Sequence, residues 1–280
     1  MPKPKRVLCM MDLAVAGRSS LAAVLPVLAA CGVQACPLPT MLLSTHTGGF
    51  GSPAVQQNTE FCEKALAHFK QQGISFDAVY TGYLQGSAQF ALAEAAFAQY
   101  PDAFKVADPA MGDNGLLYTG LSEQTAAAMV ALCEKADLVT PNFTESALLL
   151  GLPPLMEPLS RSGMAQRLQA LSGARRQVLV TSSPTPEGGM EIWAAAPGGP
   201  PFAIPTYHVP QNYPGTGDLF TAAVTGLVLR GLSLHASTQA AADFVRSAAL
   251  LTLQQQGEAR HGIWFEPFLS TLSLAANSGM

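Results

Sequence analysis

Residues 215–218 of this chain read Gly-Thr-Gly-Asp and stand directly before an apolar helix pattern. Glycines on both sides of Thr216 permit a tight turn, so several free N–H groups at the helix N-terminus can point at one anion. Asp218 follows at once and can take the proton of an attacking alcohol while a transferring phosphate is held beside it. The same four residues also fit an ordinary turn with a helix cap, because Gly, Thr and Asp are common there. The rest of the chain must distinguish a phosphorylating site from a plain turn.

The composition favours a protein with a large buried core. The chain has 280 residues, of which 49% are apolar and 12% charged, and its net charge is −4. Chains of this size often form one α/β domain, so we expect a single domain over residues 1–280. The weak negative charge gives no support for a nucleic-acid or membrane partner. Any phosphate must then be bound by local backbone donors and a metal rather than by a basic patch.

The cysteines and the first residues predict a reducing compartment. Five cysteines are scattered through mostly apolar runs, which is typical of buried free thiols. Cys31 and Cys36 lack a second pair or a histidine at zinc-ligand spacing. The chain starts basic and then apolar, but Asp12 and Arg18 interrupt the run, so it fits neither a signal peptide nor a membrane span. We therefore expect a cytoplasmic enzyme.

Short apolar runs alternate with helix-period segments, which predicts a mostly parallel sheet covered by helices on both faces. The expected parallel strands cover residues 7–11, 33–38, 78–81, 104–108, 138–140 and 178–181. The expected helices cover residues 19–31, 59–72, 87–100, 123–135, 145–150, 164–171, 217–230 and 238–255. Residues 190–195 and 202–208 flank a Pro/Gly-rich turn and predict an antiparallel hairpin at the sheet edge. We expect the last two helices to complete the fold and residues 277–280 to be frayed.

Polar residues interrupt the apolar pattern where the predicted strands end. They are Asp12, residues 81–83, Asp108, residues 140–142 and residues 181–183. In an open parallel sheet the carboxyl ends of the strands meet at one rim, and ligands gather there. Turn chemistry alone does not explain this clustering, so the sequence predicts a polar ligand site at the rim.

Six short blocks occur in the order found in one group of kinases. They are residues 6–12 (RVLCMMD), 44–50 (STHTGGF), 80–84 (YTGYL), 108–113 (DPAMGD), 140–145 (TPNFTE) and 215–218 (GTGD). With these blocks, most of the chain resembles bacterial pyridoxal/pyridoxamine kinases of the ribokinase-like superfamily. The Asp-Pro and Thr-Pro-Asn blocks are also shared with hydroxymethylpyrimidine kinases.

The resemblance implies a ribokinase-like fold, a homodimer, and transfer of the γ-phosphoryl group of ATP to the 5′-hydroxymethyl group of a vitamin B6 pyridine. Asp218 would be the catalytic base. The backbone N–H groups of Gly215, Thr216 and Gly217 would form the anion hole and bind ATP. This agrees with the chemistry that the residues themselves suggest.

The resemblance also implies a shell of oxygen ligands for Mg²⁺ and phosphate. The metal-binding positions would be Asp108, Asp113, Thr140 and Glu145, and the further ATP-binding positions Asn142, Glu145, Thr181 and Ser182. A K⁺ ion would lie near Asp108, Thr140 and Thr181. Mg²⁺ prefers such oxygen ligands and keeps several waters. Asn142 and Glu145 also fit a helix N-cap and a first-turn acid, and one residue can serve both purposes.

For the vitamer, the resemblance implies contacts from Asp12, Thr47 and Tyr83, with Asp218 beside the reacting hydroxyl. An aromatic ring such as Tyr83 can lie against a flat pyridine. The same tyrosine also fits a core aromatic with a tethered hydroxyl.

Two loops are expected to enclose the ligands. Residues 44–52 would form a mobile cover that excludes water, and His46 within them could contact either substrate or backbone. The hairpin of residues 188–208 would flank the nucleotide, with residues 207–213 near the adenine.

Residues 15–16, Val-Ala, stand where relatives place larger or more polar residues, so ring selectivity stays open. Three functions are therefore compared: a vitamin B6 kinase, a kinase for hydroxymethylpyrimidine or another small hydroxymethyl ring, and a vitamer-binding protein without turnover. The intact motif at residues 215–218 argues against the last.

Overall fold

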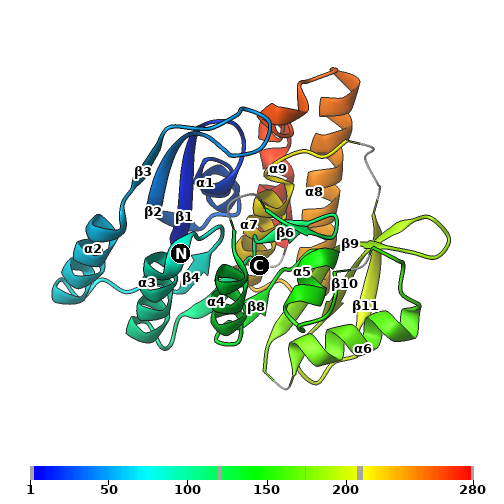
Figure 1. Ribbon diagram of the computed structural model, residues 1–280, viewed down its shortest axis with the longest axis horizontal. Helices are drawn as coiled ribbons and strands as arrows, with labels where there is room; N and C mark the ends of the chain where they lie inside the picture. The colour runs from blue at the N-terminus through cyan, green and yellow to red at the C-terminus, as the bar shows by residue number, and fades with distance from the viewer. Residues whose placement is uncertain (1–2, 119–120, 155, 174, 207–210, 279–280) are drawn as a thin grey trace.

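The computed structural model describes residues 3–118, 121–154, 156–173, 175–206 and 211–278. Within them, a nine-stranded sheet has the order β11-β10-β9-β8-β5-β4-β1-β2-β3 (Figure 1). Its strands are β1 (Arg6–Ala16), β2 (Gln34–Thr45), β3 (Val55–Gln57), β4 (Ala78–Thr81), β5 (Phe104–Ala107), β8 (Leu138–Val139), β9 (Gln177–Pro184), β10 (Met190–Ala195) and β11 (Phe202–Thr206). A separate small hairpin pairs β6 (Gly112–Asp113) with β7 (Leu116–Leu117).

The centre of the sheet is parallel. Strands β2, β1, β4, β5, β8 and β9 run in one direction. β10 pairs antiparallel with both β9 and β11, so the predicted edge hairpin is confirmed. At the opposite edge β3 pairs antiparallel with β2. The predicted α/β class with a mostly parallel sheet is also confirmed.

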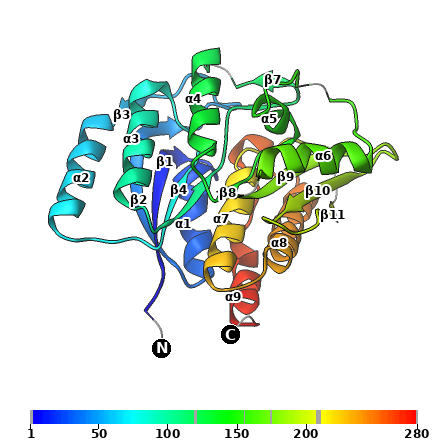
Figure 2. The same cartoon turned by 90° about the horizontal axis from the view of Figure 1, so that it is seen from below.

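Helices cover both faces of the sheet (Figure 2). One face carries α1 (Ser20–Ala30), α7 (Thr216–Leu229), α8 (Leu234–Gln254) and α9 (Leu269–Ser278), and the other carries α2 (Thr59–Gln71), α3 (Gly86–Gln99), α4 (Glu123–Cys133) and α6 (Arg161–Ser172). Val7 and Cys9 of β1 belong to the first core, whereas Leu8 and Met10 belong to the second. This is the period of two that a strand buried on both faces requires. The short helix α5 (Phe143–Leu148) begins soon after β8.

The C-terminal part differs from the prediction. The expectation that two helices complete the fold is wrong, because α9 follows α8 and buries Leu272 and Ala276 in the first core. Two 3₁₀ turns, η1 (Ala259–His261) and η2 (Glu266–Phe268), connect α8 to α9. Residues 277–278 belong to α9 rather than to a frayed end, and residues 279–280 lie outside the described residues. The predicted strand over residues 202–208 is β11, which ends at Thr206. Residues 207 and 208 lie outside the described residues.

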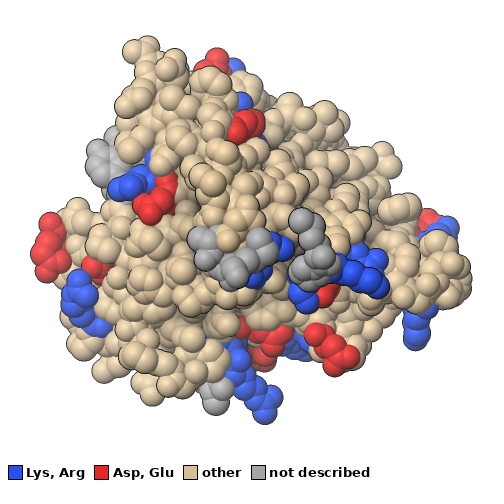
Figure 3. All heavy atoms as spheres, turned by 180° about the vertical axis from the view of Figure 1, so that it is seen from behind, with Lys and Arg blue, Asp and Glu red and all other residues tan. Residues whose placement is uncertain are grey.

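On the face behind the view of Figure 1, small groups of both charge signs are separated by wide uncharged areas (Figure 3). All five cysteines are free thiols, and four of them are buried, as predicted. Of the helices in the described part of the chain, none is long and apolar enough to cross a membrane.

Candidate active site

Asp12 lies inside β1, at an irregularity of the strand. The register between β1 and β2 shifts between Met11 and Leu13, and the pairing of β1 with β4 ends at Met10. A bulge re-aims the side chain at such a point, and Asp12 is 2% exposed. The prediction that Asp12 follows the first strand is therefore corrected: β1 continues to Ala16 because β2 still pairs with it.

The first residue of α1, Ser20, joins two aspartates. The hydroxyl of Ser20 donates a hydrogen bond to Oδ1 of Asp12 at 2.5 Å. The backbone N–H of the same serine donates to Oδ2 of Asp218 at 2.7 Å. Ser20 has a φ of +50°, which is uncommon for a residue other than glycine. One residue in a strained conformation thus contacts both carboxylates.

The Gly-Thr-Gly-Asp turn opens α7 with free backbone donors. Gly215 is the N-cap, and the first intrahelical bond runs from the N–H of Leu219 to the carbonyl of Gly215 at 3.0 Å. The N–H groups of Thr216 and Gly217 precede that bond, as at any helix N-terminus. The hydroxyl of Thr216 donates to the carbonyl of Tyr213 at 3.2 Å and so helps to hold the turn. The geometry is that of an anion-binding helix start.

Asp218 is not the cap of α7. The cap position carries no side-chain hydrogen bond, and the Asp218 carboxylate instead accepts from Ser20 of another element. Asp218 is partly exposed to solvent. Desolvation by the surrounding protein nevertheless raises the pKa of its carboxyl from 3.8 to about 8. The charges of Asp108 and Asp12 raise this pKa further, and the bond from Ser20 opposes them. A carboxyl with a pKa in this range is matched to general base catalysis near neutral pH.

The hydroxyl of Thr221, one helical turn after Asp218, connects α7 to the residues that follow β5 and β8. Oγ1 of Thr221 lies 3.1 Å from Oδ2 of Asp108 and 2.9 Å from Oγ1 of Thr140. Asp108 follows β5, Thr140 follows β8, and both side chains are buried. Burial raises the pKa of Asp108 to about 7, with the Thr221 bond opposing the shift. The structure therefore brings Asp12, Asp108, Thr140 and Asp218 together at one rim, as the sequence predicts.

Asn142 and Glu145 form a capping box at the start of α5. Oδ1 of Asn142 accepts from the N–H of Glu145 at 2.9 Å, and Oε2 of Glu145 accepts from the N–H of Asn142 at 2.8 Å. Oε1 of Glu145 also accepts from the N–H of Met111 at 3.0 Å. The capping interpretation of both residues is thus confirmed. Burial, followed by the charge of Asp108, raises the pKa of Glu145 well above its ordinary value.

The predicted metal positions provide separate oxygen atoms rather than a closed site. Asp113 is half-buried in the β6–β7 hairpin and accepts from the N–H of Asn114 at 2.8 Å. Among the described residues, no three His, Cys, Asp or Glu side chains form a group that could hold a metal ion. The donor set of Asp108, Asp113 and Thr140 still suits Mg²⁺, which accepts a few protein oxygens and keeps several waters.

His46 fixes the loop that follows β2. Its Nδ1 accepts from the N–H of Gly48 at 3.1 Å, and its Nε2 lies 2.6 Å from the carbonyl oxygen of Arg260. Because a carbonyl only accepts, Nε2 carries the proton. The ring of Phe50 packs edge-on against both His46 and His261, with centroids 5.1 Å apart in each pair. His46 thus contacts backbone, which is one of the two contacts expected from the sequence.

The remaining predicted residues make fewer polar contacts, and Thr181 and Ser182 lie inside β9 rather than after it, because pairing with β10 extends the strand to Pro184. Tyr83 is half-buried, and burial followed by the charge of Asp12 raises its pKa. Thr47 is exposed in the loop after β2. The N–H of Thr181 donates to the carbonyl of Pro141 at 2.9 Å, and Ser182 is exposed with a φ of +53°. Within the segment predicted near the adenine, residues 207–210 lie outside the described residues.

Sequence reasoning missed Ser20 and Thr221 as site residues. Thr221 left a signal, since it is a polar residue in an apolar helix, one turn after Asp218. Ser20 left none that distinguishes it from an ordinary residue at the start of a helix.

Comparison with known proteins covers nearly the whole chain. The family model described as phosphomethylpyrimidine kinase matches residues 17–262. A pyridoxine/pyridoxal/pyridoxamine kinase from Bordetella pertussis is 30% identical over 90% of this chain and 89% of its own length. A Schizosaccharomyces pombe protein assigned as a pyridoxal kinase is 29% identical over 66% of this chain. The matched part spans 61% of the length of that relative.

Solved structures share the fold, and two of them illustrate the similarity. A Bacteroides thetaiotaomicron protein, assigned to the phosphomethylpyrimidine kinases and crystallised with pyridoxal, has a TM-score of 0.91 and 34% identity over 96% of each chain. The pyridoxal kinase from Lactobacillus plantarum has a TM-score of 0.89 and 30% identity over 99% of each chain. The predicted ribokinase-like architecture is therefore confirmed.

Proposed function

The chain belongs to the phosphomethylpyrimidine kinase family, and from this membership and the site geometry we propose that it is a vitamin B6 kinase. It transfers the γ-phosphoryl group of ATP to the 5′-hydroxymethyl group of pyridoxal, pyridoxamine or pyridoxine. One observation carries the proposal: Asp218 lies directly behind the Gly-Thr-Gly turn, oriented by the Ser20 N–H at 2.7 Å and close enough to Asp108 for their charges to interact.

In the proposed reaction Asp218 is the general base. The vitamer hydroxyl gives its proton to this carboxylate while its oxygen attacks the γ-phosphorus and the bond from that phosphorus to the bridging oxygen of ADP breaks. The N–H groups of Gly215, Thr216 and Gly217 stabilise the negative charge on the transferring group. Because they are backbone donors in a preformed turn, they need no reorganisation during the step.

Asp108, Asp113, Thr140 and Glu145 are the proposed metal positions. Burial, followed by the charge of Asp108, raises the pKa of both Glu145 and Asp218, so the site gathers carboxylates whose charge a cation would offset. Mg²⁺, when bound, neutralises charge on the phosphates. Glu145 acts mainly by holding residues 111–112 and Asn142, because both of its oxygens already accept backbone N–H bonds. We place K⁺ near Asp108, Thr140 and Thr181, and the ATP phosphates near Asn142, Thr181 and Ser182.

Asp12, Thr47 and Tyr83 are the proposed vitamer contacts. Asp12 and Tyr83 are close enough for the carboxylate to raise the tyrosine pKa, so a polar ring could meet both at once. The pyridine ring suits the aromatic face of Tyr83. Closure of the loop after β2 would bring Thr47 toward the ring and exclude water.

A kinase for hydroxymethylpyrimidine is the second candidate, and the description of the family model favours it. The relatives named as pyridoxal kinases, together with the 34% identical structure that holds pyridoxal, favour the B6 vitamers. A vitamer-binding protein without turnover would not need the base, the anion hole and the acidic shell together.

We also propose a homodimer. Val15 and Val55, on the part of the sheet where β1, β2 and β3 extend beyond β4, are 77% and 53% exposed. Association would cover such apolar surface. Size-exclusion chromatography with light scattering would show a mass of twice 29.2 kDa; a monomer at all concentrations would contradict the proposal.

The test of function is the initial rate of ADP release with ATP, Mg²⁺ and K⁺, compared among the three B6 vitamers and hydroxymethylpyrimidine. Identification of the 5′-phosphate product must accompany it. Turnover on a vitamer that disappears in Asp218→Ala would support the proposal. Turnover on hydroxymethylpyrimidine alone would assign the second candidate, and vitamer binding without turnover on any substrate would assign the binding protein.

A further inference from the structure

Ser20 stands between the vitamer side and the phosphate side of the site. Its hydroxyl bonds to Oδ1 of Asp12 and its backbone N–H bonds to Oδ2 of Asp218, at 2.5 and 2.7 Å. Ser20 is 6% exposed. Each carboxylate therefore has one oxygen bonded to Ser20.

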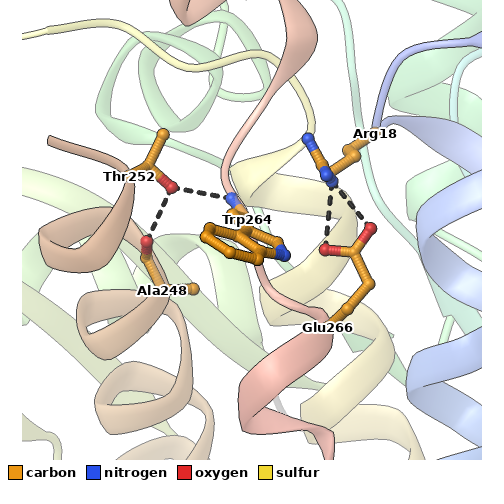
Figure 4. A network of polar contacts seen from close by, with 5 residues as sticks. All are labelled: Arg18, Ala248, Thr252, Trp264 and Glu266. Carbon is orange, nitrogen blue, oxygen red and sulfur yellow. Dashed lines mark hydrogen bonds and ion pairs between the residues drawn. The ribbon is translucent and has the colours of Figure 1, made fainter. Parts of the chain in front are cut away.

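The conformation of Ser20 is held in place by its surroundings. A φ of +50° costs free energy for a residue with a Cβ, and such strain persists where neighbouring contacts enforce it. Arg18, two residues before Ser20, donates from Nε to Oε1 and Oε2 of Glu266 at 2.7 and 3.0 Å. Its backbone N–H donates to the carbonyl of His261 at 3.2 Å. Figure 4 shows Arg18 and Glu266 facing each other beside Trp264.

This support is itself fixed to α8. The N–H of Trp264 donates to Oγ1 of Thr252 at 2.7 Å, and the hydroxyl of Thr252 donates to the carbonyl of Ala248 at 2.8 Å (Figure 4). Residues 261–266, which follow α8, thus hold Arg18 in the turn before α1. A strained residue that is held by its neighbours and contacts two site carboxylates is typical of a preorganised site.

We propose that Ser20 is a positioning residue that sets Asp12 for vitamer binding through its hydroxyl and Asp218 for proton transfer through its backbone N–H. This inference rests on the proposed function. The hydroxyl of Ser20 should affect vitamer binding and its backbone N–H should affect proton transfer. The two effects can be separated, because a side-chain substitution removes the hydroxyl and retains the N–H.

The first test is Ser20→Ala in the full-length protein. A hydrogen bond to a charged group is typically worth enough to change an equilibrium about 10- to 100-fold, so KM for the vitamer should rise within that range. The kcat value should change much less, since the N–H to Asp218 remains. Ser19→Ala is the matched control, because Ser19 is equally buried and its hydroxyl has no hydrogen-bond partner among the described residues.

Ser20→Gly separates positioning from stability. Glycine accepts a positive φ without cost, so this variant should unfold at a higher temperature than Ser20→Ala. Its KM should nevertheless be at least as high, because the hydroxyl is missing. A merely structural role predicts the reverse, with the more stable variant the more active one.

A double-mutant cycle identifies the partner. In an Asp12→Ala background, Ser20→Ala should raise the vitamer KM little further, because the acceptor is already gone. An unchanged KM in Ser20→Ala, or an equal effect with and without Asp12, would overturn the inference while an active wild type leaves the proposed function standing. A wild type that neither binds pyridoxal by calorimetry nor phosphorylates it would overturn both.

Discussion

Gly215 lies so close to Arg18 that a Cβ added to the glycine would overlap the carbonyl oxygen of the arginine. The φ of Gly215 is +86°, a conformation that side chains rarely adopt. The phosphate-side turn and the segment before α1 therefore approach each other at backbone distance between Gly215 and Arg18.

Gly215→Ala should separate these two turns and displace the anion hole. We expect activity to fall by at least about 100-fold, because a displacement near 1 Å has that effect on a catalytic geometry. Gly231→Ala is the control, since Gly231 has a φ of +94° and an added Cβ there meets no described atom within 4 Å. It should lower the stability by about 1 kcal/mol through backbone strain and leave kcat unchanged. Equal activity of the two variants would contradict the role of the contact.

Asp218→Asn should abolish most activity and make the protein more stable at alkaline pH. Loss of a general base lowers kcat by about 10² to 10⁴. The folded-state pKa of Asp218 is raised from 3.8 to about 8, so ionisation of this group opposes folding as pH rises through that range. Asparagine removes the ionisation and can still accept the Ser20 N–H. Thermal unfolding at pH 4 and pH 8.5 should show a gain at the higher pH only; a lower melting temperature at pH 8.5 would contradict this account.

The free enzyme should lose stability with rising pH, and cations should restore it. Asp12, Asp108 and Asp218 have pKa values raised to about 6, 7 and 8. The folded state therefore binds more protons than the unfolded state between about pH 4 and pH 8, and stability falls across this window. Mg²⁺ and K⁺ should raise the melting temperature more at pH 8 than at pH 5. Asp108→Asn should reduce this cation effect, whereas an effect independent of pH would argue against a cation near these carboxylates.

The sequence predicts the local parts of this structure better than the contacts between them. β4 and β10 match their predicted bounds, because β4 is a short apolar run after Asp77 and β10 lies between two glycines and a Pro/Gly-rich turn. β1 extends five residues further than predicted, from 11 to 16, because pairing with β2 overrides the interruption at Asp12. Such pairing is non-local and leaves no mark in the strand itself.

The same limit applies to the site. The rim position of Asp12, Asp108 and Asp218 follows from the strand–helix alternation. The bond from Ser20 to Asp218 joins residues 198 apart in sequence, and the bond from Thr221 to Asp108 joins residues 113 apart. Only the folded chain shows which serine or threonine holds which carboxylate.

The loop anchored by His46 should determine how well ATP is protected from water. His46→Ala removes the bonds to Gly48 and Arg260 and one face of the packing around Phe50. A loosened cover should raise KM for the vitamer by up to about 30-fold, since two hydrogen bonds are lost and each is worth about 1 kcal/mol. It should also admit water to the γ-phosphoryl group, so that more ADP than vitamer phosphate is formed. The measurement is the ratio of ADP to vitamer phosphate, with His68→Ala, an exposed histidine on α2, as the control. A ratio that stays at one in His46→Ala would mean that water is excluded by other parts of the site, and that the loop has no role as a cover.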